Sequence, residues 1–254
     1  MLTVSRLSIT PVRSLALQHP ERIQLDEHGV RNDRRYFLLD ETGRIFDATK
    51  LGPLLAIRAE LEPDPERLAL HFPDGSLVAG AVELGDPFGA VIYGREFSAR
   101  PVIGPWSAAL SAYAGTQVQL VRSDRLPGEH DRSPVSIVST ASVEELARRG
   151  NEGRPLDSRR FRMLIEVSGA RPHDEDEWLG RDVRMGGAVV HVTRPDPRCV
   201  ITTLDPNTGR RDFPTLKAIK EYRGLREGKK IDFGVYADVV TPGAVSLGDE
   251  IHPI

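Results

Sequence analysis

The sequence contains a single cysteine, Cys199, among its 254 residues. One cysteine cannot form an intramolecular disulfide, and it cannot supply the four thiolates that hold an iron–sulfur cluster. If this protein carries out redox chemistry, its electrons must therefore come from an external donor.

Long apolar runs and a charge excess are missing as well. No stretch approaches the roughly 18 apolar residues that a membrane-spanning helix needs, and residues 1–6 lack the charged head and apolar core of a signal peptide. We therefore expect a cytoplasmic protein with no membrane partner. With a net charge of −3 the chain has no excess of basic residues, so we expect no nucleic-acid partner either.

Several common catalytic motifs are also absent. The sequence has no glycine-rich phosphate loop ending in Lys-Ser/Thr, no dinucleotide fingerprint, no His-Glu-x-x-His and no Gly-x-Ser-x-Gly. No two of the seven histidines lie three or four residues apart, so nothing predicts a local zinc site.

Short apolar runs between turn residues dominate what the sequence does contain. Glycine (23 residues) and proline (19 residues) are plentiful and evenly spread, a pattern typical of many short strands and not of a helical bundle. The predicted strands are residues 4–9, 36–39, 54–61, 68–72 and 118–121. The segment 233–251 predicts two more strands around the turn at Pro242-Gly243.

Three helices are also predicted, at 106–114, at 142–149 and from Pro214 onward. The first follows a proline and precedes a glycine, and the second begins with a Ser-x-x-Glu capping box. The third carries apolar side chains at helical spacing. The polar stretch 123–132 separates a strand-rich region from a mixed α+β region, and we place the domain boundary there.

The segment around Cys199 has the composition of a reactive site. Two prolines stiffen its approach, and Arg194 and Arg198 are nearby cations that favour the thiolate. A thiolate ligates a soft metal or attacks an electrophile. We expect a strand to follow at 200–204. From spacing alone, the alternative is that Cys199 is a small buried hydrophobe.

Two arginine-bearing stretches near the N-terminus form a second cluster, Pro11-Val12-Arg13-Ser14 and Asp33-Arg34-Arg35. Arginines at strand ends suit phosphate because the guanidinium fork matches its oxygens. Ordinary surface arginines are the alternative. The acidic run 173–177 lacks the ligand spacing of a calcium loop, so we interpret it as a solvated loop and not as a hard-cation site.

With these residues the chain resembles the MOSC family, the domains related to the C-terminal part of molybdenum-cofactor sulfurase. The two-domain form, which has an N-terminal MOSC β-barrel domain, is similar to the mitochondrial amidoxime-reducing component and its bacterial relatives. In the first part the resemblance is carried by Pro11-Val12-Arg13-Ser14, Gly29-Val30, Asp33-Arg34-Arg35-Tyr36 and Leu38-Leu39-Asp40. In the second part it is carried by Asp131-x-Ser133-Pro134, Phe161-Arg162, the specific string Arg198-Cys199-Val200-Ile201-Thr202-Thr203-Leu204-Asp205-Pro206-x-Thr208-Gly209, and Phe233-Gly234-Val235-Tyr236.

The resemblance implies a mainly β fold with α+β elements. It implies a MOSC N-terminal β-barrel domain at residues 1–122 and a MOSC domain at 123–254, with a β-barrel core and peripheral helices. It also implies a molybdenum cofactor, a pyranopterin whose dithiolene chelates the metal, in the cleft between the domains. Pyridoxal phosphate is not an expected ligand.

The resemblance further assigns roles to individual residues. Cys199 would be the protein's sulfur ligand to molybdenum, and Asp131 would lie near the metal and assist proton transfer as a second catalytic residue. The residues expected to hold the pterin and its phosphate are Arg13, Ser14, Arg34, Ser139, Arg162 and Arg198.

The chain departs from the family pattern at several positions. Arg13 replaces the family's lysine, Pro197 replaces a polar residue two positions before the cysteine, and Leu164 replaces the asparagine of the amidoxime reducers. These changes leave the cysteine and the phosphate arginines in place, but they alter the immediate surroundings of the metal.

Three functions are compatible with these patterns. The first is an oxidoreductase that reduces N-hydroxylated compounds (hydroxylamines, amidoximes, N-oxides) with electrons from an external donor of the ferredoxin or flavin reductase type. The second is a non-catalytic protein that carries or delivers the cofactor or its sulfur. The third is a metal-free redox protein in which Cys199 forms a sulfenic acid or a persulfide.

Overall fold

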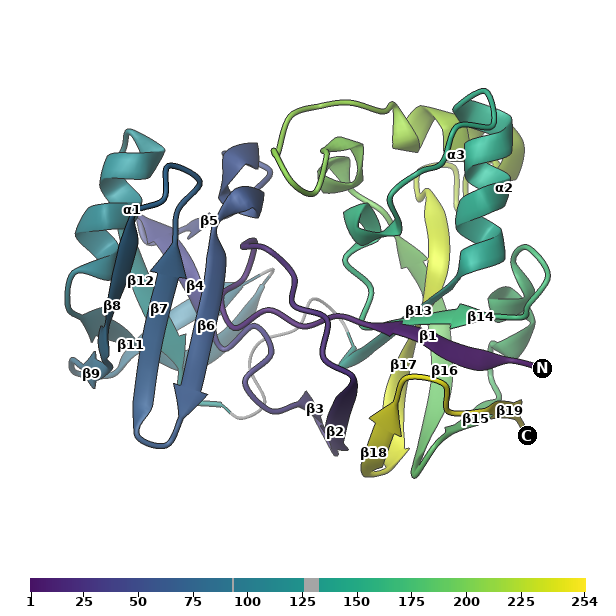
Figure 1. Ribbon diagram of the computed structural model, residues 1–254, viewed down its shortest axis with the longest axis horizontal. Helices are drawn as coiled ribbons and strands as arrows, with labels where there is room; N and C mark the ends of the chain where they lie inside the picture. Colours follow the sequence, from purple (N-terminus) through teal and green to yellow (C-terminus); the bar gives the residue numbers. More distant parts are fainter. Residues whose placement is uncertain (93, 126–132) are drawn as a thin grey trace.

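Most of the chain folds into β-strands, as the sequence predicts (Figure 1). The computed structural model describes residues 1–92, 94–125 and 133–254. Within these residues the strands form four sheets, and three α-helices lie at the periphery. The predicted fold class, mainly β with α+β elements, is therefore confirmed.

The largest sheet forms a nearly closed barrel in the C-terminal half, with the strand order β1-β14-β13-β17-β16-β15-β19. These strands are β1 (Thr3–Leu7), β13 (Val135–Ser139), β14 (Ile165–Ser168), β15 (Asp182–Met185), β16 (Ala188–Pro197), β17 (Asp232–Thr241) and β19 (Ile251–Pro253). The Ile251 N–H donates to the Leu2 oxygen at 2.9 Å, and Thr3 bridges Glu250, so the first and the last strand meet. The two chain termini consequently lie close together (Figure 1).

Two further sheets make up most of the N-terminal half (Figure 1). One sheet contains β4 (Tyr36–Asp40), β5 (Ile45–Phe46), β9 (Glu83–Leu84), β10 (Phe88–Ile92), β11 (Arg95–Ile103) and β12 (Val118–Ser123). The other contains β6 (Arg58–Pro63), β7 (Glu66–His71) and β8 (Leu77–Ala81), which pair in sequence order.

The small fourth sheet joins distant parts of the chain. It consists of β2 (Arg22–Asp26), β3 (Gly29–Val30) and β18 (Gly243–Ser246), with β2 in the middle. Because β1 also pairs with β14, the first strands belong to sheets of the C-terminal half. The segment between β1 and β2 already reaches the N-terminal half, because the Arg13 N–H donates to the Tyr36 oxygen and the Ala16 N–H donates to the Ile57 oxygen. A domain boundary between residues 122 and 123 stays a prediction.

The helices follow the predicted positions, with one correction. The α-helices are α1 (Trp106–Ala114), α2 (Thr140–Gly150) and α3 (Thr215–Arg223). The short 3₁₀ helices are η1 (Gly52–Ala56), η2 (Ser158–Phe161), η3 (Asp174–Trp178) and η4 (Val200–Thr203). The N-cap of α2 is Ser139 and not Ser142: the backbone of Ser139 is extended, and its hydroxyl oxygen accepts the Ser142 N–H at 3.1 Å.

Two predicted strands are wrong because local turns replace them. Residues 54–61 divide into η1 and β6, since Pro53 lies in the first turn of η1 and favours a helical start. Residues 200–204 form η4 instead of a strand. The Thr202 hydroxyl donates to the Cys199 carbonyl at 2.9 Å, and the Thr203 hydroxyl donates to the Val200 carbonyl at 2.7 Å. These local hydrogen bonds satisfy the two carbonyl groups without a partner strand.

The acidic run 173–177 is not the solvated loop that the sequence suggested. Most of it forms η3, and Glu175 is fully buried. The Glu175 carboxylate accepts the Ser139 N–H at 3.2 Å and the Ser142 hydroxyl at 2.7 Å, at the N-terminus of α2. Burial nevertheless raises the pKa of Glu175.

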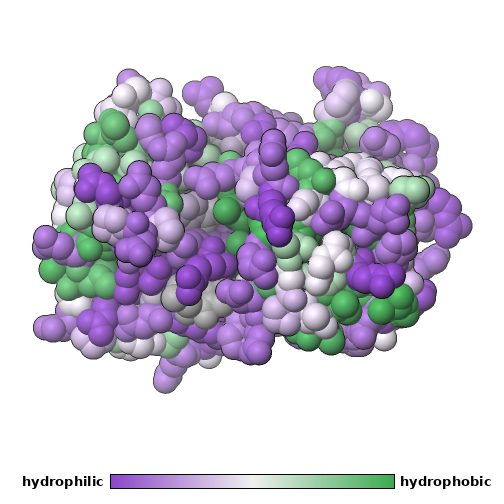
Figure 2. Space-filling model, turned by 60° about the horizontal axis from the view of Figure 1, so that its bottom comes forward, coloured by the Kyte–Doolittle hydropathy of each residue, from purple (hydrophilic) through white to green (hydrophobic). Residues whose placement is uncertain are grey.

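Each half of the molecule has its own apolar core. The barrel core is built around buried strand residues such as Val135, Ile165 and Val235, and the N-terminal core around residues such as Leu38 and Leu68. On the face drawn in Figure 2, hydrophobic side chains are interspersed with hydrophilic ones. No helix in the described parts of the chain is long and apolar enough to cross a membrane.

A close backbone contact connects the two halves near Cys199. Gly52 begins η1 in the N-terminal half, and Gly209 ends the turn that follows η4. A Cβ on Gly52 would lie 2.0 Å from the Gly209 oxygen, and a Cβ on Gly209 would lie 2.0 Å from the Gly52 oxygen. Only two glycines allow this approach, so no side chain separates the backbones.

We predict that Gly52→Ala destabilises the protein by about 1–3 kcal/mol, because the added methyl group must push η1 away from the Cys199 half. The free energy of unfolding from urea titration measures this effect. Gly89→Ala is the matched control: a Cβ there meets nothing within 4 Å, and the change should stay within about 0.5 kcal/mol. Equal values for the two variants would contradict the tight contact.

Candidate functional site

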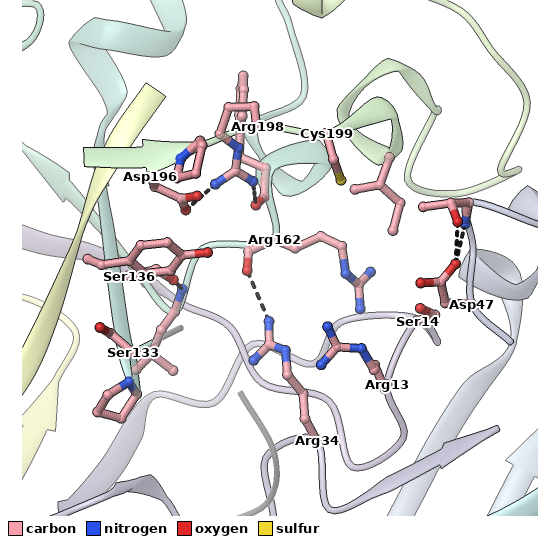
Figure 3. Close-up of a pocket in the computed structure, with 17 residues that line it drawn as sticks. Arg13, Ser14, Arg34, Asp47, Ser133, Ser136, Arg162, Asp196, Arg198 and Cys199 are labelled. Carbon is pink, nitrogen blue, oxygen red and sulfur yellow. Dashed lines mark hydrogen bonds and ion pairs between the residues drawn. The ribbon is translucent and has the colours of Figure 1, made fainter. Parts of the chain in front are cut away.

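A pocket lies where loops of the two halves face each other (Figure 3). It encloses about 820 Å³, its open mouth included. From the N-terminal half it is lined by Arg13, Ser14, Arg34, Asp47 and Thr49. From the C-terminal half it is lined by Ser133, Pro134, Ser136, Phe161, Arg162, Leu164, Asp196, Pro197, Arg198, Cys199, Ile201 and Tyr236.

The fold brings the two arginine-bearing stretches of the sequence together. The Arg13 N–H donates to the Tyr36 oxygen at 2.7 Å, and the Arg34 N–H donates to the Thr10 oxygen at 2.6 Å. Asp33 is fully buried between them and accepts the Thr10 N–H at 2.8 Å. Two segments that are more than 20 residues apart in sequence thus present their arginines on one wall.

Arg162 joins this wall from the C-terminal half. It follows η2 with a left-handed backbone (φ 54°), and its guanidinium donates to the Leu15 oxygen at 2.8 Å. In turn, the Arg34 guanidinium donates to the Arg162 oxygen at 3.1 Å. Figure 3 shows the side chains of Arg13, Arg34 and Arg162 converging on the same space.

The convergence of these cations carries an electrostatic cost. Burial and, after it, the neighbouring charges of Arg34 and Arg13 lower the pKa of Arg162 to about 9, while Asp33 opposes them. Four arginines and two aspartates are among the described lining residues, so the pocket lining is cationic on balance. A bound anion would relieve this repulsion.

Arg198 lies on the opposite side of the pocket and is held by the protein. Its guanidinium is ion-paired with Asp196, donates to the Phe161 oxygen, and lies 3.3 Å from the Met163 sulfur. It also packs over the Phe161 ring at 5.6 Å. Its buried Nε has no hydrogen-bond partner among the described residues.

Cys199 is exposed, immediately precedes η4 and lines the pocket. The alternative that it is a small buried hydrophobe is therefore wrong. Its carbonyl oxygen accepts the Thr202 N–H at 3.2 Å, which holds the cysteine at the N-terminus of the short helix. The thiol consequently faces the same space as the converging arginines (Figure 3).

The structure brings most of the predicted site residues together, with two exceptions. Ser139 is fully buried as the cap of α2 and is not among the described residues that line the pocket. Asp131 lies outside the described residues. The sequence analysis missed Asp196 and Tyr236. Side chains alternate between the two faces of a strand, but which face of β16 and β17 points inward is known only once the strands are paired.

The fold and the pocket define a mainly β protein of two parts with a cationic, thiol-bearing ligand site between them. The comparisons identify its family. Residues 1–99 match the MOSC N-terminal beta barrel domain, and residues 124–252 match the MOSC domain. The chain therefore belongs to the MOSC family, as its motifs suggested.

Among curated proteins the chain is similar to two groups of relatives. It is 26% identical to mitochondrial amidoxime-reducing component 1 of Mus musculus and 25% identical to component 2 of Bos taurus, in each case over 98% of this chain and 82% of that protein. It is also 25% identical to molybdenum cofactor sulfurase of Caenorhabditis elegans, over 92% of this chain and 33% of that protein.

Solved structures provide a more distant comparison. The YUAD protein from Bacillus subtilis is 14% identical, with a TM-score of 0.47 over 99% of this chain and 94% of that one.

We predict that inorganic phosphate stabilises the ligand-free protein through the arginine wall. At ten times its dissociation constant, phosphate should add about 1.4 kcal/mol to the free energy of unfolding, and Arg162→Met should abolish this gain. Calorimetry with and without phosphate, at constant ionic strength, measures it. Arg184→Met, an exposed arginine on β15, is the control and should respond like the wild type. Equal responses in all three proteins would place the anion elsewhere.

Proposed function

We propose that this protein binds a molybdenum cofactor in the pocket between its two halves and reduces N-hydroxylated compounds. The observation that carries the proposal is the convergence of Arg13, Arg34 and Arg162 opposite the exposed thiol of Cys199. The similarity to amidoxime-reducing components and to a molybdenum cofactor sulfurase supports the same ligand.

The residues present fit the two ends of such a ligand. A pterin phosphate is an anion, and three guanidinium groups from separate segments suit its oxygens. The orphaned Nε of Arg198 provides a buried donor for a further polar atom of the ligand. Molybdenum is a soft metal for which a thiolate is a preferred ligand, and Cys199 supplies that sulfur.

The pocket also suits the reduction of an N-hydroxylated compound. When bound, a molybdenum cofactor supplies a two-electron centre that can accept an oxygen atom from an N–O group. The protein's part is to fix the cofactor from two sides, to limit the access of water and to position the substrate next to Cys199. Electrons would come from an external donor of the ferredoxin or flavin reductase type. Asp131, which lies outside the described residues, is one group that we propose for proton transfer, on the resemblance alone.

A second function, carriage of the cofactor or its sulfur without turnover, is favoured by the lining of the pocket. Pro197 and Leu164, two of the departures from the family pattern, both line it. Neither side chain can donate a hydrogen bond to a substrate. Turnover experiments distinguish a carrier from a reductase.

We predict that Cys199→Ser lowers the bound molybdenum at least about tenfold, because the hard hydroxyl replaces the soft sulfur. The measurement is molybdenum per chain by elemental analysis, on protein from a host that makes the cofactor. Thr193→Ser, at an exposed position of β16, the strand that precedes Cys199, is the control. Full molybdenum content in the serine variant would refute the ligand assignment, and none in either protein would favour the metal-free thiol function.

We also predict that the loaded protein reduces hydroxylamine, an amidoxime or an N-oxide with an artificial one-electron donor. Oxidation of reduced viologen, followed at saturating substrate, measures turnover, and the matching amine or amidine serves as the blank. A loaded protein that none of these compounds reoxidises would favour the carrier function instead.

A further inference from the structure

A buried carboxylate lies on the pocket wall beside the proposed metal ligand. Asp196 is in β16, three positions before Cys199, and it is 2% exposed although it lines the pocket. Its side chain is ion-paired with Arg198, and the Tyr236 hydroxyl lies close enough for each of the two groups to shift the pKa of the other. Tyr236 is 8% exposed and lines the same pocket from β17.

The surroundings of Asp196 raise the pKa of its carboxyl group toward neutral pH. Burial has the largest effect and raises its pKa to about 6. Among the groups that face it, Arg198, the Tyr236 hydroxyl and Arg34 favour the carboxylate, while Asp232 on β17 favours the neutral acid. In turn, burial and the adjacent Asp196 charge raise the pKa of Tyr236.

The other aspartate among the described lining residues is used differently. Asp47 accepts the Thr49 N–H at 2.9 Å and the Thr49 hydroxyl, so its carboxylate closes a local turn. Asp196 instead lies next to a second pocket-lining side chain, Tyr236, from another strand. This arrangement connects a buried acid to a hydroxyl at the pocket surface.

We propose that Asp196 and Tyr236 form a proton-donating pair for this pocket, in which Asp196 stores the proton and the Tyr236 hydroxyl passes it to the oxygen atom that leaves an N-hydroxylated substrate. The proposal rests on the proposed function. Tyr236 is the catalytic residue, and Asp196 acts through it as a positioning residue.

The pair matches the stoichiometry of the reaction. Reduction of R–NH–OH to R–NH₂ and water breaks one N–O bond and consumes two electrons and two protons. The electrons come from the external donor. When Asp196 is neutral, its O–H donates to the Tyr236 oxygen, and the phenol proton is then free to leave toward the substrate. The phenol regains a proton from Asp196, and Asp196 is reprotonated from water before the second transfer.

The pKa of Asp196 suits the role of a general acid. General acids work best when their pKa lies near the working pH, and they contribute roughly 10²–10⁴-fold to the rate. Asp196 meets this requirement, whereas an exposed aspartate with a pKa of about 3.9 does not.

The first test uses the cofactor-free protein and does not depend on turnover. Carboxyl ¹³C NMR, assigned with Asp196→Asn, should show one aspartate that titrates near pH 6. Tyr236→Phe should raise that midpoint, because the Tyr236 hydroxyl favours the carboxylate form of Asp196. A midpoint near 3.9, or no shift in the phenylalanine variant, would overturn the pair.

The second test uses the loaded enzyme. The wild-type rate should fall as pH rises through about 6, because the stored proton is lost above that pH. Tyr236→Phe should lower kcat about 10²-fold with a smaller change in KM. Asp196→Asn should remove the pH dependence, and Asp196→Glu should restore it, which a purely structural role would not do.

Matched variants separate this proposal from the proposed function. Tyr113→Phe and Asp182→Asn remove the same groups far from the pocket, where Tyr113 donates to the Pro53 oxygen and Asp182 contacts His191. Both should behave like the wild type. Turnover with an unchanged pH profile in the Asp196 and Tyr236 variants would overturn the proton pair alone. A wild-type enzyme without turnover would overturn the proposed function and the pair with it.

Discussion

The segment 8–16 crosses between the two halves of the molecule, and the geometry of the pocket depends on its hydrogen bonds to both. At one end the Ser8 N–H donates to the Leu164 oxygen at 2.9 Å, and at the other the Ala16 N–H donates to the Ile57 oxygen at 2.9 Å. Between these anchors the chain passes the pocket with Arg13. The pairing of β1 with β14 fixes where this crossing starts. An arginine near the N-terminus thereby faces a cysteine almost 190 residues later in the sequence.

The second constraint is electrostatic. The fold forces arginines from three segments into one partly desolvated space, where burial and, after it, the charges of Arg34 and Arg13 lower the pKa of Arg162. Folding alone gains nothing from such an arrangement, and strained sites of this kind are where proteins give up stability for ligand binding. On the other wall, the charge of Arg198 is matched by Asp196. The pocket therefore has one wall on which three guanidinium groups converge, with Asp33 paired to Arg34, and another wall on which Arg198 is paired with Asp196.

Much of the fold followed from local sequence patterns, and the errors have local causes. The helix at 106–114 was predicted to the residue because Pro105 and Gly115 mark its ends. The strand expected at 200–204 became η4 because two threonine hydroxyls bond to the carbonyls behind them. The cap of α2 was misplaced by one turn because serines at both 139 and 142 fit the capping pattern, and only the end of β13 decides between them.

The sequence by itself determined the residue types of the site: a lone cysteine among prolines and arginines, and two further arginine stretches whose pattern is that of the MOSC family. The tertiary structure decided which of them share a space. It assigned Ser139 to a helix cap and Arg198 to an ion pair, and it added Asp196 and Tyr236 to the pocket wall. The physical reason is that local patterns encode turns and strands. The pairing of distant strands, by contrast, determines which side chains lose water together and so which charges and protons the pocket holds.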